Sequence, residues 1–363
     1  MSIRLRLLSA MSSISAVSPR HPCIGWDIGG AHLKVARLDA DGRLVEAAQY
    51  ATPLWLGLGP LRDILTGIGR TIDGRSVRHG LTMTGELVDV FPDRDHGVNG
   101  LLDAFESGFP GHAAAVYSND GSFLSVPEAR RDWRRVASAN WHATASLAAR
   151  LEPRGILIDI GSTTTDLVPF DAHSLCHRGN TDQERLRFDE LVYTGIVRTP
   201  VMALVQRVPF AGRWQNLAAD FFATTADVYR ITGELREADD LLDPADHGGK
   251  RREDSLRRLA RMLGTDAGPG LEPELSALAG FIAERQIDLI DGALQRLLGD
   301  LPGVRGAPLI GAGSGRFLVR RLASRCGVRY VDFDELAGIA GSEGAAVCAT
   351  AVAVALLART GHA

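Results

Sequence analysis

Cysteine is scarce in this chain: 363 residues contain four cysteines, and none of them stands in a CxxC pair. Disulfide frameworks and structural zinc sites both need paired or clustered cysteines. We therefore expect reduced thiols in a cytoplasmic protein, with neither a disulfide framework nor a structural zinc site.

An excess of positive charge is also missing. The formal net charge is −4, which argues against a broad nucleic-acid-binding surface. Long apolar runs are absent too, because the most apolar helical stretch, 345–358, is shorter than the roughly 20 residues that cross a bilayer. We expect no nucleic-acid partner and no membrane partner, and a homodimer is compatible with the sequence.

Length and composition predict two domains, since 363 residues with 45% hydrophobic content can bury a substantial core. We expect the first domain over 22–150 and the second over 151–363, with a charged helical insertion at about 200–300. An alanine-rich helix over 342–358 is expected to pack back at the domain junction. Residues 1–21 have a weak apolar run broken by serines, so we interpret them as a disordered N-terminal extension rather than a signal peptide.

Within the first domain, apolar periodicity predicts an opening antiparallel meander of strands, joined by a tight turn at Asp41 and Gly42. Helical spacing returns over 129–151. In the insertion, the arginines that include Arg257, Arg258 and Arg261 are interpreted as the solvated side of an amphipathic helix.

Two stretches repeat one pattern, a short apolar run that ends in Asp-Ile-Gly. The first ends at Asp27, Gly29 and Gly30, and the second at Asp159 and Gly161. A buried strand that ends in a carboxylate and turns through glycine leaves backbone N–H groups free to face an anion. The two turns predict a cleft with a phosphate-binding loop on each wall.

Asp27 and Asp159 are therefore candidate catalytic residues and Mg²⁺ ligands, because a cation must separate aspartates from an anionic diphosphate. Phosphate donors are expected from both loops, namely Gly29, Gly30, Gly161, Ser162, Thr163 and Thr164. Lys34 reaches a phosphate or simply points outward. A single copy of this pattern would favour a plain turn, but the matched repeat favours a site.

One further carboxylate follows a predicted strand between the two loops. Asp120 is a candidate general base, because a desolvated carboxylate has a pKa raised toward a useful range. The surrounding Asn-Asp-Gly sequence is an equally strong signal for a plain turn, so both interpretations stand.

A glycine-rich turn at 311–315 precedes a predicted helix. Arg316 stands where a dinucleotide-binding loop has its third glycine, which disfavours that assignment. We predict instead that Gly311, Gly313 and Ser314 border a nucleotide-like or substrate pocket, where a planar group lies against the backbone.

In order and spacing, these three motifs resemble the two phosphate motifs and the adenosine motif of the sugar kinase, heat-shock protein and actin (ASKHA) superfamily. The resemblance covers nearly the whole chain. It implies an α/β fold of two ribonuclease H-like domains around a central cleft, with a helical insertion in the second domain.

More specific blocks resemble the furan-methanamine synthase family of methanofuran biosynthesis, once labelled hydantoinase/oxoprolinase-like and linked to tetrahydromethanopterin C1-transfer pathways. They cover 83–87, 138–144, 181–186, 190–195 with 198–200, and 226–233.

The resemblance implies a transferase that joins an aminomethyl-furanmethanol diphosphate to the phenol of γ-glutamyl-tyramine, forming an aryl ether and releasing diphosphate. In a bacterium the related product would be methylofuran, made from a tyrosine-like acceptor. We hypothesise that Mg²⁺ is the cofactor, that Asp120 or Glu86 deprotonates the phenol, and that Arg198 binds an acidic part of the substrate.

Two other classes stay open. The retained glycine turn keeps an ATP-dependent small-molecule kinase in view, with ATP as its cofactor beside Mg²⁺. A non-catalytic nucleotide-binding regulator of the actin or heat-shock type is disfavoured, because the chain has no substrate-peptide domain and no extended interaction tail.

Overall fold

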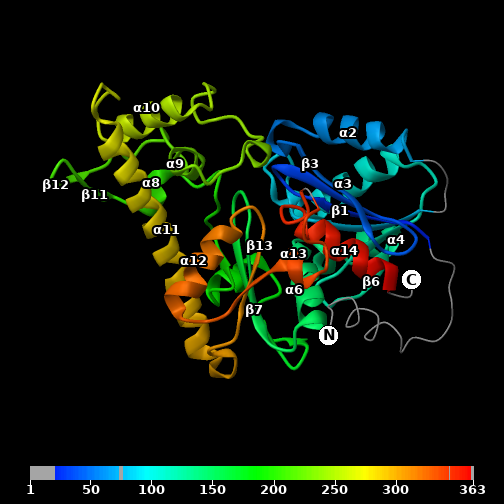
Figure 1. Cartoon of the computed structure of the whole chain (residues 1–363). Coiled ribbons are helices and arrows are strands. Elements are labelled where there is room, and N and C mark those ends of the chain that lie inside the picture. The colour runs from blue at the N-terminus through cyan, green and yellow to red at the C-terminus, as the bar shows by residue number, and fades with distance from the viewer. Residues whose placement is uncertain (1–20, 73–76, 343, 361–363) are drawn as a thin grey trace. The chain divides into compact units, whose positions relative to one another are not determined.

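The computed structural model describes residues 21–72, 77–342 and 344–360, so the predicted extension 1–21 lies outside it apart from residue 21. The described residues form two compact units (Figure 1). The first takes those within Met1–Leu157, Val168–Asp182 and Val331–Ala363, and the second takes Ile158–Leu167 and Gln183–Tyr330.

A six-stranded sheet in the order β3-β2-β1-β4-β5-β6 forms the centre of the first unit. Its strands are β1 (Cys23–Ile28), β2 (His32–Leu38), β3 (Leu44–Ala51), β4 (Arg78–Met83), β5 (Ala114–Tyr117) and β6 (Phe123–Ser125). The first three strands form the predicted antiparallel meander, whereas β4 is parallel to both β1 and β5. This order confirms the ribonuclease H-like topology.

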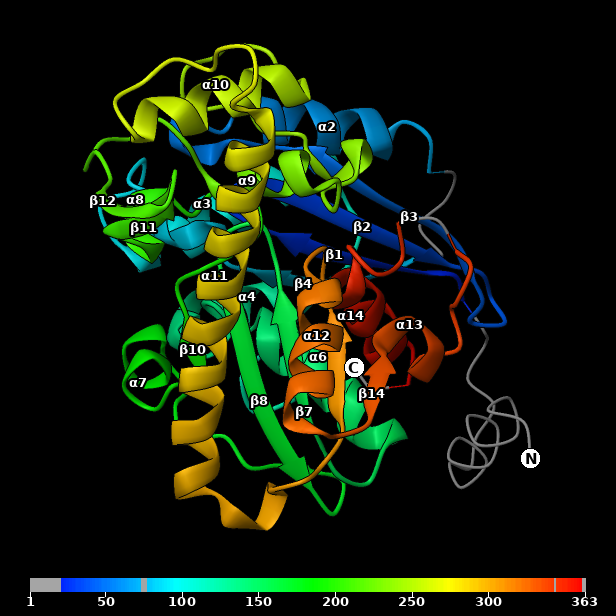
Figure 2. The ribbon, with the colours of Figure 1, turned by 60° about the vertical axis from the view of Figure 1, so that its left-hand side comes forward.

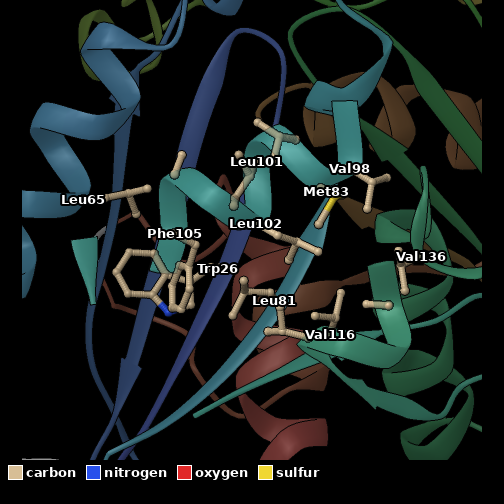
Figure 3. Close-up of a cluster of buried hydrophobic side chains, with 14 of the residues drawn as sticks. Trp26, Leu65, Leu81, Met83, Val98, Leu101, Leu102, Phe105, Val116 and Val136 are labelled. Carbon is tan, nitrogen blue, oxygen red and sulfur yellow. The ribbon is translucent and has the colours of Figure 1, made fainter. Parts of the chain in front are cut away.

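Alternation along β1 assigns its two faces, because successive side chains point to opposite sides of a strand. Ile24, Trp26 and Ile28 join one apolar cluster with helices α2 (Gly59–Gly69) and α3 (Arg94–Gly108). Figure 3 shows Trp26 beside Phe105 of α3 in this cluster, with Leu81 of β4 among its members. The first sheet is therefore anchored by large side chains on this face.

On the other face of β1 and β4, Gly25 and Gly80 are paired across the two strands, so no side chain projects from the sheet at this point. The alanine-rich helix α14 (Ala349–Thr360) packs there and also contacts helix α6 (Asn140–Leu151), as Figure 1 shows for the red helix beside the blue strand. A Cβ atom on Gly25 would collide with the carbonyl oxygen of Ala351, so glycine is required for this close approach.

A second sheet has the order β10-β8-β7-β13-β14 with β9 beside β8, so that, as in the first sheet, its earliest strand lies between the second strand and a later crossover strand. Its strands are β7 (Gly155–Ile160), β8 (Thr165–Asp171), β9 (Ser174–Leu175), β10 (Leu191–Val192), β13 (Leu309–Ala312) and β14 (Tyr330–Asp332). The two sheets together confirm the predicted α/β fold of the ASKHA type.

The stretch predicted as a helical insertion contains mainly helices, and α11 is the longest of them in the described residues (Figure 2). Between β9 and β14 the α-helices are α7 (Asp182–Arg187), α8 (Val201–Leu204), α9 (Thr225–Thr232), α10 (Arg252–Met262), α11 (Glu272–Asp300) and α12 (Arg316–Cys326). A hairpin of β11 (Arg207–Phe210) and β12 (Arg213–Asn216), which the sequence did not predict, lies between α8 and α9.

The stretch 129–151, predicted to have helical spacing, is mostly helical but is divided into separate helices. The segment contains α4 (Val126–Arg131), α5 (Trp133–Val136) and α6, and Ser138 between the last two has a left-handed backbone with φ of 50°. A residue in that conformation cannot continue a right-handed helix. Short elements complete the chain: η1 (Leu54–Leu56), η2 (Gly85–Leu87), η3 (Glu237–Asp239), η4 (Pro302–Val304) and α13 (Phe333–Leu336).

Among the described residues, no helix combines the length and apolar character that crossing a membrane would require.

Candidate functional site

Three of the predicted carboxylates lie at one edge of the first sheet. Strands β1, β4 and β5 run parallel, so their carboxyl ends meet at the same edge. Asp27 is the penultimate residue of β1, Glu86 follows β4, and Asp120 follows β5. The fold thus gathers residues that are far apart in the sequence.

Asp27 is buried, with only 4% of its surface exposed. The register of β1 and β2 places it opposite Lys34, whose Nζ lies 3.9 Å from Oδ2 of Asp27. Lys34 therefore points toward the aspartate rather than outward.

The first glycine loop closes on itself. The N–H of Gly29 donates to the carbonyl oxygen of His32 at 2.9 Å, so this N–H group is engaged within the hairpin. Gly85 packs against the loop, because a Cβ atom there would lie 3.1 Å from the carbonyl oxygen of Ile28 and 2.6 Å from a methyl group of Leu54. The segment that carries Glu86 therefore rests directly on the first glycine loop.

Glu86 is the most deeply buried of these carboxylates, with 1% of its surface exposed. Its Oε1 accepts a hydrogen bond of 2.7 Å from the Ser138 hydroxyl, and among the described residues no group bonds its Oε2. Burial raises the pKa of Glu86, and the hydrogen bond from Ser138 opposes that shift only in part. A carboxylate of this kind can accept a proton from a weakly acidic group.

Asp120 has different surroundings. It accepts hydrogen bonds from the hydroxyls of Ser118 and Ser122 and from Nη2 of Arg135 at 2.5 Å. Partial desolvation would raise its pKa, but these donors outweigh that effect and hold the pKa of Asp120 well below its ordinary value. This arrangement suits a turn-stabilising carboxylate better than a base, and it favours Glu86 for that role.

In the second unit, Asp159 precedes the loop of Gly161, Ser162, Thr163 and Thr164. The N–H of Gly161 donates to Thr164 within the loop at 2.9 Å. Donors for an anion at the two glycine loops must therefore come from residues other than Gly29 and Gly161, which corrects the prediction for those two N–H groups.

The segment 195–198 is fastened to this loop. The N–H groups of Val197 and Arg198 donate to the carbonyl oxygen of Ser162 at 3.1 and 2.9 Å, which places Arg198 beside the loop. A Cβ atom on Gly195 would lie 2.6 Å from the carbonyl oxygen of Gly161 and would collide with the Thr163 nitrogen. Glycine is therefore required where the two segments cross.

The turn at 311–315 also meets the second loop. Gly313 has a left-handed backbone with φ of 79°, and a Cβ atom there would collide with Oδ1 of Asp159. Ser314 lines a cavity of about 240 Å³ together with Phe317, three arginines and two acidic residues. The ring of Tyr330 covers Gly311. The second unit therefore brings together Asp159, the loop 161–164, Arg198 and the predicted pocket residues.

Several buried polar residues behind this site were missed by the sequence analysis. Gln286 of α11 donates to the hydroxyl of Thr194 and to the carbonyl oxygen of Gly195 at 2.8 and 2.9 Å, and it accepts from Tyr229 at 2.6 Å. Thr194 and Tyr229 belong to two of the motif blocks, which was the available signal. Gln286 offered none, since one glutamine in a long helix has no pattern.

The interpretation of Arg258 as solvated is wrong. Its side chain is fully buried and donates from Nε to Oδ1 of Asp227 at 2.8 Å. Asp227 also accepts from Ser255 and Arg230 at 2.8 and 3.0 Å. A buried arginine is tolerated where a carboxylate pairs with it and its other N–H groups are bonded.

Across the described ranges, no group of three or more His, Cys, Asp or Glu side chains is placed to hold a metal ion. Mg²⁺ commonly takes only one or two protein carboxylates and completes its shell with substrate phosphates and water. Asp27 and Asp159 are oxygen donors of the kind that Mg²⁺ prefers.

Comparison with known proteins supplies the family. The hydantoinase/oxoprolinase family model matches residues 78–355. A protein of Methanocaldococcus jannaschii named (4-{4-[2-(gamma-L-glutamylamino)ethyl]phenoxymethyl}furan-2-yl)methanamine synthase is 34% identical over 269 residues, which cover 74% of this chain and 79% of the relative. A Methanococcus vannielii protein of the same name is 32% identical over 121 residues, which cover 33% of this chain and 54% of the relative.

Among solved structures, nucleotide-free acetone carboxylase is similar with a TM-score of 0.51 and 10% identity, over 89% of this chain and 70% of that one. That likeness concerns the fold alone. The family match and the long alignment with the first relative show that this chain belongs to the hydantoinase/oxoprolinase family and, within it, to the furan-methanamine synthase family.

Proposed function

We propose that this protein is an ether-forming transferase of methanofuran-type cofactor biosynthesis. The phenol oxygen of γ-glutamyl-tyramine, or of a tyrosine-like acceptor, forms a bond to the furfuryl carbon of an aminomethyl-furanmethanol diphosphate. The bond between that carbon and the diphosphate oxygen breaks, the phenol proton passes to Glu86, and diphosphate leaves as an anion.

The observation that carries this proposal is the state of Glu86. It is a buried carboxylate with a raised pKa and an oxygen that no described residue bonds, and its segment rests on the first glycine loop. A phenol has an ordinary pKa of about 10, and proton transfer improves as the pKa of the base rises toward that of the acid. The name of the 34% identical relative supports a phenol ether as the product.

Diphosphate departure is the other half of the reaction. We assign diphosphate-binding groups within each unit, namely Gly30 and Lys34 in the first and Arg198 with the hydroxyls of 162–164 in the second, because backbone N–H, positively charged and hydroxyl groups stabilise the charge that develops on a departing diphosphate. Asp27 in the first unit and Asp159 in the second each fit as a Mg²⁺ ligand, and an ion bound by such a carboxylate would neutralise diphosphate charge. The furfuryl cation is stabilised by resonance in its ring, so alignment of the phenol is the remaining task.

The acceptor needs a place for its polar end. We assign it to the cavity beside Ser314, near Gly311 and Gly313, whose three arginines outnumber its two acidic residues. An amino-acid carboxylate is a chemically suitable occupant for such a cavity.

The deciding experiment incubates the purified protein with Mg²⁺ in two separate assays. One contains the furan diphosphate with γ-glutamyl-tyramine or tyrosine, and the other contains ATP with candidate alcohols. We expect an aryl ether and stoichiometric diphosphate in the first assay without nucleotide. Phosphoryl transfer from ATP, with no ether from either acceptor, would overturn the proposal in favour of a kinase.

A further inference from the structure

Three of the motif blocks that resemble the synthase family contribute residues to one buried cluster in the first unit. Glu86 comes from the block 83–87, Ser138 from 138–144 and Asp182 from 181–186. The Ser138 hydroxyl lies 2.7 Å from Oε1 of Glu86 and 3.3 Å from Oδ2 of Asp182. Ser138 thus joins two carboxylates that are 96 positions apart in the chain.

A serine hydroxyl has one proton, so it can donate to only one of these carboxylates at a time. When Glu86 is ionised, Ser138 donates to Glu86. When Glu86 carries a proton, Glu86 can donate to the Ser138 oxygen, which leaves the hydroxyl proton free to turn toward Asp182. The cluster therefore has two hydrogen-bonded arrangements that differ by the position of one proton.

The backbone at Ser138 holds the hydroxyl in this place. Its φ of 50° lies in the left-handed region, which side chains other than those of Asn and Asp seldom adopt, and 4% of its surface is exposed. Glycine would relieve the backbone but would remove the hydroxyl. Strained residues of this type are concentrated at functional sites.

The two carboxylates of the cluster differ in charge balance and in exposure to solvent. Nη2 of Arg94 lies 2.7 Å from Oδ2 of Asp182, so a fixed positive charge balances that carboxylate. The Asp182 side chain is 17% exposed, whereas Glu86 is 1% exposed. The side chains that act on the pKa of Glu86 are Ser138, Arg94 and Asp182, and of the two carboxylates Asp182 is the one in contact with solvent.

We propose that Ser138 and Asp182 form a proton relay that removes the phenol proton from Glu86 after each turnover. This proposal rests on the proposed function. Glu86 takes the phenol proton at Oε2, turns its carboxyl group about its last side-chain bond, and gives the proton to the Ser138 oxygen. Ser138 passes its own hydroxyl proton to Asp182, which releases it to water. The serine hydroxyl is restored, and no other bond changes.

Kinetics of Ser138→Ala and Asp182→Asn test the relay. We expect kcat to fall about tenfold to a hundredfold with KM nearly unchanged, and the double variant to be no slower than the slower single variant, because both changes cut one path. Ser138→Gly, which keeps the backbone conformation, should match Ser138→Ala. Ser146→Ala and Asp103→Asn, a serine and an arginine-paired carboxylate outside the cluster, serve as controls that leave kcat unchanged. Two results together would overturn the relay: a rise in KM as large as the fall in kcat in each single variant, and a double variant whose loss equals the sum of the two single losses in free energy.

A second measurement needs no turnover. Infrared difference spectra recorded against pH, with the band assigned through Glu86→Gln, report the protonation of Glu86. We expect Ser138→Ala to raise the titration midpoint of Glu86 and Asp182→Asn to lower it. If neither variant moves the midpoint, the relay is overturned whatever the enzyme makes; if both do and the wild type makes no ether, the proposed function fails instead.

Discussion

At the scale of single residues, two carboxylates that follow neighbouring parallel strands have opposite properties. Glu86 loses its contact with water and gains one hydrogen bond, so burial dominates and its pKa rises. Asp120 stays largely exposed and gains an arginine and two hydroxyl donors, so its pKa falls. Position at the sheet edge is therefore shared, whereas basicity is set by each residue's immediate partners.

Substitution of Glu86 by Gln is expected to lower kcat by a factor of about 10² to 10⁴, the usual contribution of a general base. In the wild type, kcat/KM should rise with pH through the pKa of Glu86, which lies above its ordinary value, and this acidic limb should be lost in the variant. Steady-state rates across pH measure both effects.

Two matched variants sharpen this test. Glu106→Gln changes an exposed glutamate that is paired with Arg130 and should leave the profile unchanged. Asp120→Asn should cost less activity than Glu86→Gln. A larger loss from Asp120→Asn would assign the base to Asp120.

Local patterns predicted the residues at the strand ends, because a strand and its glycine turn are encoded by adjacent positions. The same patterns misplaced Arg258. Its burial depends on Asp227 in another helix, and helical periodicity cannot distinguish a charged residue facing water from one facing a buried partner. The role of Gln286 was hidden for the same reason.

At the scale of elements, the second glycine loop is held by a neighbouring segment rather than by its own sequence. The N–H groups of 196–198 bond the carbonyl oxygens of Gly161 and Ser162, and Gln286 in turn supports Thr194 and Gly195. Gly195 lies at the crossing. The loop 161–164 can be recognised from the sequence. The hydrogen bonds that hold it to 196–198 join residues more than 30 positions apart, so only the structure shows them.

Gly195→Ala is expected to push the loop 161–164 away from the segment behind it. Overpacking of this kind typically costs about 1 to 3 kcal/mol of stability. Denaturant unfolding should show that loss, and KM for the diphosphate should rise because the loop moves. Gly280→Ala, in open space within α11, is the control and should be neutral or stabilising. An unchanged KM in Gly195→Ala would separate this loop from diphosphate binding.

The break between α5 and α6 has a related origin. Residues on both sides of Ser138 have helical spacing, and nothing local forbids helix at serine. The break is imposed by the hydrogen bonds that Ser138 makes to Glu86 and Asp182, which come from distant segments.

At the scale of the whole molecule, a buried histidine links stability to pH. His79 accepts a hydrogen bond from Nε1 of Trp26 at 3.1 Å and lies 3.1 Å from His112. Burial, followed by the nearby His112, lowers the pKa of His79 from 6.5 to about 4. The folded protein therefore holds this imidazole neutral where the unfolded chain would protonate it.

We expect the contribution of His79 to the free energy of unfolding to be complete above pH 6.5. It should be lost as the pH drops toward 4, because the unfolded chain then binds a proton that the folded protein does not. A shift of this size corresponds to about 3 kcal/mol. Equilibrium unfolding of His79→Gln, which keeps an acceptor for Trp26 but no titration, should show a weaker acid dependence. The exposed His247→Gln should keep the wild-type slope, and an identical slope in His79→Gln would contradict the assignment.

The bare glycine face of β1 and β4 bears on how the polypeptide is made. Helix α14, which covers that face, is synthesised more than 300 residues after β1. During synthesis on the ribosome, this apolar side of the sheet therefore remains uncovered until α14 is made, and chaperones and proteases can bind it. A premature stop before residue 349 would release a product with this side permanently bare, and cellular quality control should remove it even though every strand of the first sheet has been translated.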